Sequence, residues 1–232
     1  MKIKYDMSRI VYRRTTAFFI FLLLFILGVV FFLVAANLIG FAFNKLGFPP
    51  EYSILLLFLS LIGSHVNIPI KVIRSQEPVI SGGIVDFYGF RYVLPLLEIE
   101  ERQTVIAINL GGCVIPVLIS IFLTPMVNPI DLVTGVFIMT VLIYMMARPV
   151  KGLGIAVPAL IPPVMAAVLA PLIAPQSAPI LAYISGTLGS LIGADLLNLK
   201  KIPYLGTPIA SIGGAGTFDG IFLTGIISVL LA

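Results

Sequence analysis

The stretch "SIGGAGTFDGIFLTGIIS", Ser211–Ser228, places a carboxylate inside an otherwise apolar segment near the end of the chain. Gly213, Gly214 and Gly216 come shortly before Asp219, and glycine costs a helix about 1 kcal/mol per residue relative to alanine. The segment is therefore predicted to unwind and to restart as a helix close to Asp219. Because a charged group in hydrocarbon is costly, Asp219 is expected to have both a partner and a function.

The composition around this stretch is that of a membrane protein. Of 232 residues, 59% are hydrophobic and only 10% are charged, whereas a soluble domain has about a quarter of its residues charged. We therefore expect a multi-pass protein of the cell membrane, with the lipid bilayer as its principal partner. The single Cys113 and the single His65 allow no internal disulfide and leave little scope for a metal site, so no cofactor is predicted.

Seven apolar stretches are long enough to cross a bilayer, for which about 20 residues are needed. The predicted fold is an all-α polytopic bundle, a single transmembrane domain of residues 1–232 whose last helix is broken or re-entrant. The predicted spans are 16–43, 52–71, 103–123, 129–147, 152–174, 178–199 and 204–231.

The basic residues predict the orientation of these spans. Every Lys and Arg except Lys45 lies before the first span or in a connection on the same side of the membrane. The positive-inside rule then places the N-terminus in the cytoplasm and the C-terminus outside. The same placement accounts for the net charge of +4, so no nucleic-acid partner is expected.

The one sizeable polar loop, residues 75–102, lies on the cytoplasmic side. Its sequence "ISGGIVDFYGFRYVLPLLEIEE" alternates apolar and polar residues around Gly89, a pattern typical of a β-hairpin. We expect a cytoplasmic hairpin followed by an acidic turn. It would serve either as a structural cap under the bundle or as a docking or gating element.

Two similar segments suggest an internal repeat. "SLIGSHVNIPIK" begins at Ser60 and "SLIGADLLNLKK" begins at Ser190, and each is followed by a segment with paired glycines. Two parallel three-helix units, 16–123 and 152–231, would be joined by helix 129–147. Parallel repeats occur in transporters, with sites at the repeat interface, although short matches in Leu- and Gly-rich helices also arise by chance.

Several polar side chains are predicted at a similar cytoplasmic depth. His65, Asn67, Asn109 and Asp195 each lie within about two helical turns of a basic residue at the membrane edge. Taken singly, the histidine and the asparagines are most simply explained by hydrogen bonds between helices. As a cluster around the aspartate, His65, Asn67 and Asn109 form, together with Asn198, a candidate binding site.

Asp195 and Asp219 are the candidate catalytic pair. A re-entrant 206–216 would bring Asp219 to the depth of Asp195. Two close carboxylates share a proton, so that one can activate a water molecule while the other protonates a carbonyl oxygen. Gly213, Gly214, Gly216 and Thr217 would then give room and backbone groups to an extended transmembrane peptide substrate.

The "GADLLNL" and "GGAGTFDGIFLTGI" stretches resemble an uncharacterised prokaryotic membrane family, domain of unknown function number 1614. The likeness covers most of the chain, and membership implies no particular activity.

"GAGTFDGIF" is also similar to the Gly-x-Gly-Asp motif of presenilin, signal peptide peptidase and prepilin peptidase. That resemblance implies an intramembrane aspartyl protease with Asp195 on one helix and Asp219 at the start of the next. The sequence departs from the motif, because Thr217 and Phe218 separate the last glycine from Asp219. The triplet Pro158–Leu160 matches the presenilin Pro-Ala-Leu motif but precedes both aspartates instead of following them.

Two other functions remain open at this stage. A small proton- or ion-coupled transporter or channel would use Asp219 as a mid-membrane coupling site and Asp195 with His65 as a relay, and the proline-rich fifth span would act as its gate. A structural membrane subunit would use its polar groups only for packing. The sequence also leaves a homo-oligomer open.

Overall fold

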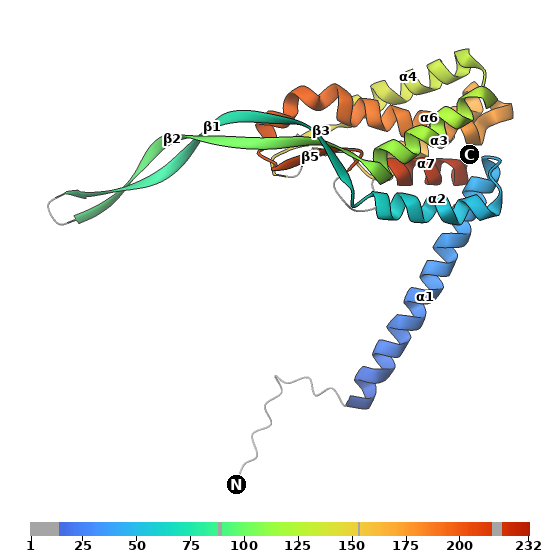
Figure 1. Ribbon diagram of the computed structural model, residues 1–232, viewed down its shortest axis with the longest axis horizontal. Coiled ribbons are helices and arrows are strands. Elements are labelled where there is room, and N and C mark those ends of the chain that lie inside the picture. The colour runs from blue at the N-terminus through green and yellow to red at the C-terminus, as the bar shows by residue number, and fades with distance from the viewer. Residues whose placement is uncertain (1–13, 88–89, 153, 215–219) are drawn as a thin grey trace, which may run out of the picture.

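In the computed structural model, the described residues are 14–87, 90–152, 154–214 and 220–232. Seven α-helices and five β-strands lie in this part of the chain. Figure 1 shows a bundle that contains α2, α3, α4, α6 and α7, with α1 and the β1–β2 hairpin leaving it in different directions. The expectation of a mostly helical chain is confirmed, whereas the all-α class is wrong in detail because the strands are substantial.

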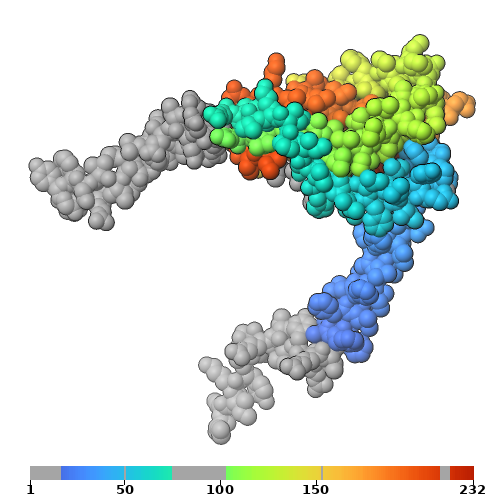
Figure 2. Space-filling model, viewed as in Figure 1, coloured from blue at the N-terminus to red at the C-terminus, as the bar shows by residue number. Residues whose placement is uncertain are grey.

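Helix α1 (Arg14–Lys45) agrees with the predicted first span. Its apolar window is exposed throughout, and Figure 2 shows the helix standing clear of the bundle along most of its length. Only the C-terminal end packs against the other helices, where Ala42, Phe43 and Leu46 are buried. The Lys45 ammonium donates to the Val229 carbonyl at 3.3 Å and so ties this end to the last helix.

Helix α2 (Pro50–Gly63) is shorter than the predicted span 52–71. The chain turns after Ser64, and strand β1 (Asn67–Phe87) begins where the helix was expected to continue. The residues responsible are β-branched Ile68 and Ile70 around Pro69. A β-branched residue favours a strand, and a proline cannot continue a helix interior. The register of β1 shifts next to Pro69, as expected for a proline within a sheet.

Strand β2 (Phe90–Asn109) likewise replaces the first part of the predicted span 103–123. A π-helical turn, η1 (Leu110–Val114), follows it and leads into α3 (Ile115–Leu123) and the short 3₁₀ turn η2 (Thr124–Met126). The helical part of this segment thus begins at Leu110 and not at residue 103, because "TVIAI" at 104–108 pairs as a strand.

The predicted hairpin is confirmed, and it is longer than residues 75–102. β1 and β2 pair in antiparallel register from Asn67–Asn109 at the base to Phe87–Phe90 near the tip. The acidic run Glu98–Glu101 lies within β2, so the expected acidic turn after the hairpin is wrong. The hairpin extends away from the helices (Figure 1).

Helix α4 (Pro129–Met146) matches its prediction, with the Asn128 side chain accepting a hydrogen bond from the Ile130 amide at its N-terminus. The fifth predicted span, 152–174, is helical only as α5 (Ile161–Ile173). The residues before it form a small antiparallel pair, β3 (Arg148–Val150) and β4 (Gly154–Ala156). Proline is favoured in the first turn of a helix, so Pro162 and Pro163 mark the start of α5, although Pro171 is also accepted in its interior.

Helix α6 (Ala178–Ser190), preceded by the 3₁₀ turn η3 (Pro175–Ser177), lies at the centre of the bundle. Close approach is possible because glycine occupies its contact positions. A Cβ atom at Gly189 would lie 2.6 Å from the Cβ of Met139 on α4, and one at Gly186 would lie 3.2 Å from the Cβ of Ala166 on α5. The helix continues as a π-helical turn, η4 (Leu191–Asp195), and a 3₁₀ segment, η5 (Leu196–Leu205).

The last predicted span is broken, as expected. Strand β5 (Ile209–Ile212) pairs in parallel with β2 and completes a sheet of order β1-β2-β5. Gly213 and Gly214 follow with φ of 87° and 92°, a region that glycine occupies without strain. Helix α7 (Gly220–Leu231) then returns into the bundle against α6. Asp219 lies outside the described residues.

Three helical segments in the described part of the chain are long and apolar enough to cross a bilayer. They are Ala17–Lys45, Pro129–Met146 and Pro175–Leu205. The other apolar helices are shorter than the roughly 20 residues needed. The helices are thus compatible with a membrane protein, but the expectation of seven full-length spans is replaced by three long helices and four short ones.

The contact between α2 and η1 gives a first prediction. A methyl group at Gly111 would overlap the Ser60 carbonyl oxygen and the Gly63 backbone. Both are backbone atoms, so they cannot move away without a cost in free energy. We expect Gly111→Ala to lower the free energy of unfolding by about 3 kcal/mol, measured by thermal unfolding in detergent micelles. Gly28→Ala is the control, because nothing lies within 4 Å of a Cβ there. Equal midpoints for the two variants would contradict this packing.

Candidate functional site

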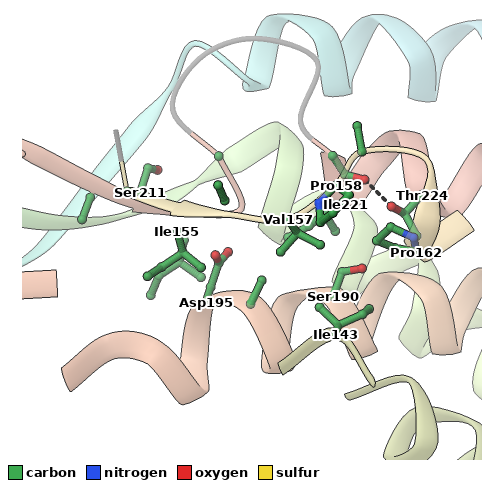
Figure 3. Close-up of a pocket in the computed structure, with 18 of the residues that line it drawn as sticks. Ile143, Ile155, Val157, Pro158, Pro162, Ser190, Asp195, Ser211, Ile221 and Thr224 are labelled. Atoms are coloured by element: carbon green, nitrogen blue, oxygen red, sulfur yellow. Dashed lines mark hydrogen bonds between the residues drawn. The ribbon is translucent and has the colours of Figure 1, made fainter. Parts of the chain in front are cut away.

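A cavity of about 430 Å³ lies where α5, α6 and the last segment all lose their helical form. One wall is β4 and the chain after it, including Pro158 and Ala159, and another is β5. Asp195, the carboxylate on the wall formed by α6 and η4, points into the cavity between Ile155 and Val157 (Figure 3). Most of the remaining lining is apolar, so a polar group bound there would be directed to this carboxylate.

The position of Asp195 follows from a change in helix type. It is the last residue of the π-helical turn η4 and directly precedes the 3₁₀ segment η5. Such single π turns are frequently found at functional sites. The Asp195 carboxylate accepts a hydrogen bond from the Gly213 amide at 2.8 Å. This bond joins α6 to the glycines that follow β5.

A second polar cluster lies at the base of the hairpin. The Asn109 amide nitrogen donates to the Ser64 carbonyl at 2.6 Å and to Asn67 Oδ1 at 3.0 Å. Asn109 Oδ1 accepts from the Gly112 amide, and the Ser211 hydroxyl donates to Asn67 Oδ1. These bonds join the end of α2, both hairpin strands and β5.

The predicted group of polar residues therefore divides. Asn67 and Asn109 meet in the hairpin cluster, whereas Asp195 lies in the cavity. Asn198 is fully buried and donates to the Gly193 and Ala194 carbonyls, so it closes the end of α6. His65 is exposed, and its ring Nδ1 forms hydrogen bonds with the Ser64 hydroxyl and the Leu61 carbonyl.

The predicted glycines are placed in part. Gly213 is bonded to Asp195, and Gly214 lines the cavity. Gly220, the first residue of α7, lines the same cavity. Gly216, Thr217 and Asp219 lie outside the described residues.

Sequence reasoning missed two hydroxyls of the cavity, those of Ser190 and Thr224. Both lie in apolar helices, where a lone Ser or Thr commonly bonds its own backbone, and Thr224 does donate to the Gly220 carbonyl. The sequence did contain an indication of their role, because Ser190 and Thr224 each lie within one or two helical turns of an aspartate. Among the described residues, no group of three or more His, Cys, Asp and Glu side chains is placed to hold a metal ion.

Comparison with protein families gives one match, to the family described as "Protein of unknown function (DUF1614)", over residues 61–231. The chain belongs to this family. The matched range starts near the end of α2 and includes the hairpin, the cavity and α7, while α1 lies outside it. Comparisons of this DUF1614 protein with curated proteins and with solved structures give no significant match.

The hairpin cluster gives a second prediction. Asn109→Ala removes three hydrogen bonds from a buried residue, to the Ser64 carbonyl, Asn67 Oδ1 and the Gly112 amide. We expect the free energy of unfolding to fall by about 2 to 4 kcal/mol, measured by denaturant titration in mixed micelles.

Asn37→Ala is the matched control, because that exposed side chain makes one local bond to the Leu33 carbonyl. We expect it to change the free energy of unfolding by about 0.5 kcal/mol or less, as for most surface substitutions. A comparable loss in both variants would show that the cluster does not hold the hairpin to the bundle.

Proposed function

We propose that this DUF1614 protein is an intramembrane aspartyl protease-like hydrolase of the cell membrane, with Asp195 and Asp219 as its two carboxylates. One observation carries the proposal. Gly220 lines the same cavity as Asp195, and Asp219 is covalently joined to Gly220. Since consecutive Cα atoms are about 3.8 Å apart, we expect Asp219 close to the Asp195 cavity.

The order of elements supports the same assignment. Asp195 ends one helix, an irregular segment and β5 follow, and the glycines then lead to Asp219 and α7. Pro158 and Ala159, which precede the aspartates in the chain, line the cavity with Asp195. The Pro-Ala-Leu triplet comes before the aspartates in this chain and after them in presenilin. Its place at the cavity is nevertheless compatible with an arrangement in space similar to that of presenilin.

The chemistry would be that of two carboxylates sharing one proton. Like charges at short range cannot both ionise easily, so one carboxyl stays protonated. The ionised carboxylate would take a proton from water as the water attacks a peptide carbonyl carbon. The protonated partner would give its proton to the carbonyl oxygen, and a tetrahedral diol would result. As the C–N bond breaks, the first carboxyl would pass the proton taken from water to the leaving amine nitrogen, and its partner would take a proton from a diol hydroxyl, so that the pair again holds one proton.

The substrate would be a transmembrane peptide in extended form. β4 and β5 both contribute residues to the cavity, and β5 is an edge strand of its sheet among the described residues. An extended peptide beside these strands would place a peptide bond next to Asp195. By the positive-inside rule the hairpin would face the cytoplasm, so the peptide would be cut near that side of the membrane.

A proton- or ion-coupled transporter is the second candidate. The observation that favours it is the position of an ionisable side chain in a cavity where helical segments are interrupted, since transporters place their sites at broken helices. The postulated repeat of 16–123 and 152–231 stays a prediction.

The proposal predicts that positions 195 and 219 come within bonding distance. In a Cys113→Ala background, which has no other cysteine, Asp195→Cys combined with Asp219→Cys should form a disulfide in membranes. Such a bond requires Cα atoms less than about 7 Å apart. The control pairs Asp131→Cys with Asp219→Cys, because Asp131 lies in the first turn of α4. Absence of a cross-link, with each cysteine reactive alone, would end the protease proposal.

Cleavage of a model transmembrane peptide by the reconstituted protein tests the activity directly. Asp195→Asn and Asp219→Asn should each abolish cleavage, since neither leaves a carboxylate pair. Asp131→Asn should retain full activity. Proton flux into vesicles that depends on Asp195, without cleavage, would instead identify the transporter. Unaltered folding with neither activity would indicate a structural subunit.

A further inference from the structure

One face of α6 carries three buried hydroxyls that have no hydrogen-bond partner on any other element among the described residues. They belong to Tyr183, Thr187 and Ser190, at spacings of four and three residues that place them on one side of a helix. Tyr183 and Thr187 are completely buried, and Ser190 is 5% exposed. Since a buried polar group without a partner costs about 1 to 3 kcal/mol, three successive ones need an explanation.

Helix α7 offers these hydroxyls little direct compensation. Gly225 packs against the Thr187 hydroxyl and the Tyr183 ring and has no side chain to bond either. The Thr224 and Ser228 hydroxyls already donate to carbonyls of their own helix. A direct bond between Tyr183 and Thr187 would still leave one of their O–H groups without an acceptor.

The row of hydroxyls starts at the Asp195 cavity. Ser190 and Thr224 line that cavity, and Figure 3 shows them at the end away from Ser211. Thr187 and Tyr183 follow at one and two helical turns beyond Ser190. The hydroxyls thus form a polar line from the carboxylate into an otherwise apolar helix interface.

We propose that Tyr183, Thr187 and Ser190 bind a file of water molecules that extends from the Asp195 cavity into the interface of α6 and α7. Water both donates and accepts, and buried water typically makes about three hydrogen bonds to polar groups that otherwise lack partners. The inference does not rest on the hydrolytic function. A file of this kind would deliver water to a hydrolase site or carry protons to and from Asp195.

Radiolytic hydroxyl-radical labelling of the full chain in lipid nanodiscs tests the proposal without any activity assay. Radicals formed from bound water oxidise the side chains beside that water, so Tyr183 should be modified although it is fully buried. Phe43 is the internal control, because it is equally buried in an apolar cluster. We expect Tyr183 to be modified several-fold faster than Phe43. Equal, low rates would overturn the proposal.

Thr187→Val replaces one hydroxyl by a methyl group of similar size and should interrupt the file. Labelling of Tyr183 should fall several-fold, while Thr187→Ser, which keeps the hydroxyl, should leave it unchanged. Ser120→Ala, which removes a buried hydroxyl bonded to the Pro116 carbonyl, should also leave it unchanged. If Tyr183 were labelled equally in Thr187→Val and in the unsubstituted protein, the proposed file of water molecules would be overturned.

Thermal unfolding gives an independent readout. In a dry interface, Thr187→Val removes an unpartnered hydroxyl and should raise the unfolding midpoint. In a hydrated interface the hydroxyl has a water partner, so the midpoint should fall. A raised midpoint would overturn the proposal even if the labelling rates were ambiguous.

Discussion

Close packing around α6 is the constraint on which the rest of the bundle depends. This helix contacts α4, α5 and α7, and the contacts require glycine where the helices cross. At Gly193 a Cβ atom would lie 2.6 Å from the Thr140 carbonyl oxygen. Helices in an apolar surrounding associate through van der Waals contact and not through a hydrophobic driving force, so small residues at the interface are what allow it.

The same packing positions the cavity. Gly193 lies inside the π-helical turn that ends at Asp195, so the helix changes form while its glycine is still held against α4. The change turns the carboxylate toward β4 and β5 instead of along the face of a regular helix. The same π-helical turn thus contains both the glycine packed against α4 and the acid of the cavity.

The sequence predicted the helices well where apolar composition alone decides. The predicted range 129–147 agrees with α4 to within one residue, and α1 is similarly close. It failed at 67–71 and 103–109, because short apolar runs fit a buried helix and a strand equally well. The choice there is made by pairing between residues far apart in the chain, Asn67 with Asn109 and Ile68 with Ile108, which a local pattern does not contain.

In the candidate site, too, some features could be predicted from the sequence and others could not. Asp195 and Gly213 could be singled out, since a carboxylate and clustered glycines are unusual in apolar segments. Their mutual hydrogen bond could not be predicted, because it depends on β5 pairing with β2. His65 was expected in the same cluster, but after the turn that ends α2 its ring bonds back to the Leu61 carbonyl.

The hairpin can also be considered as a mechanical element. Its strands have 21 and 20 residues, which at about 3.3 Å per residue gives an arm of roughly 65 Å. At its base β2 holds the four-residue strand β5, reinforced by the Thr104 hydroxyl bonded to the Thr207 carbonyl, and β5 leads directly to the Gly213 amide on Asp195. The long hairpin and the short strand β5 are thus joined through β2. A force that moves the hairpin would be transmitted through β2 and β5 to the hydrogen bond on the Asp195 carboxylate.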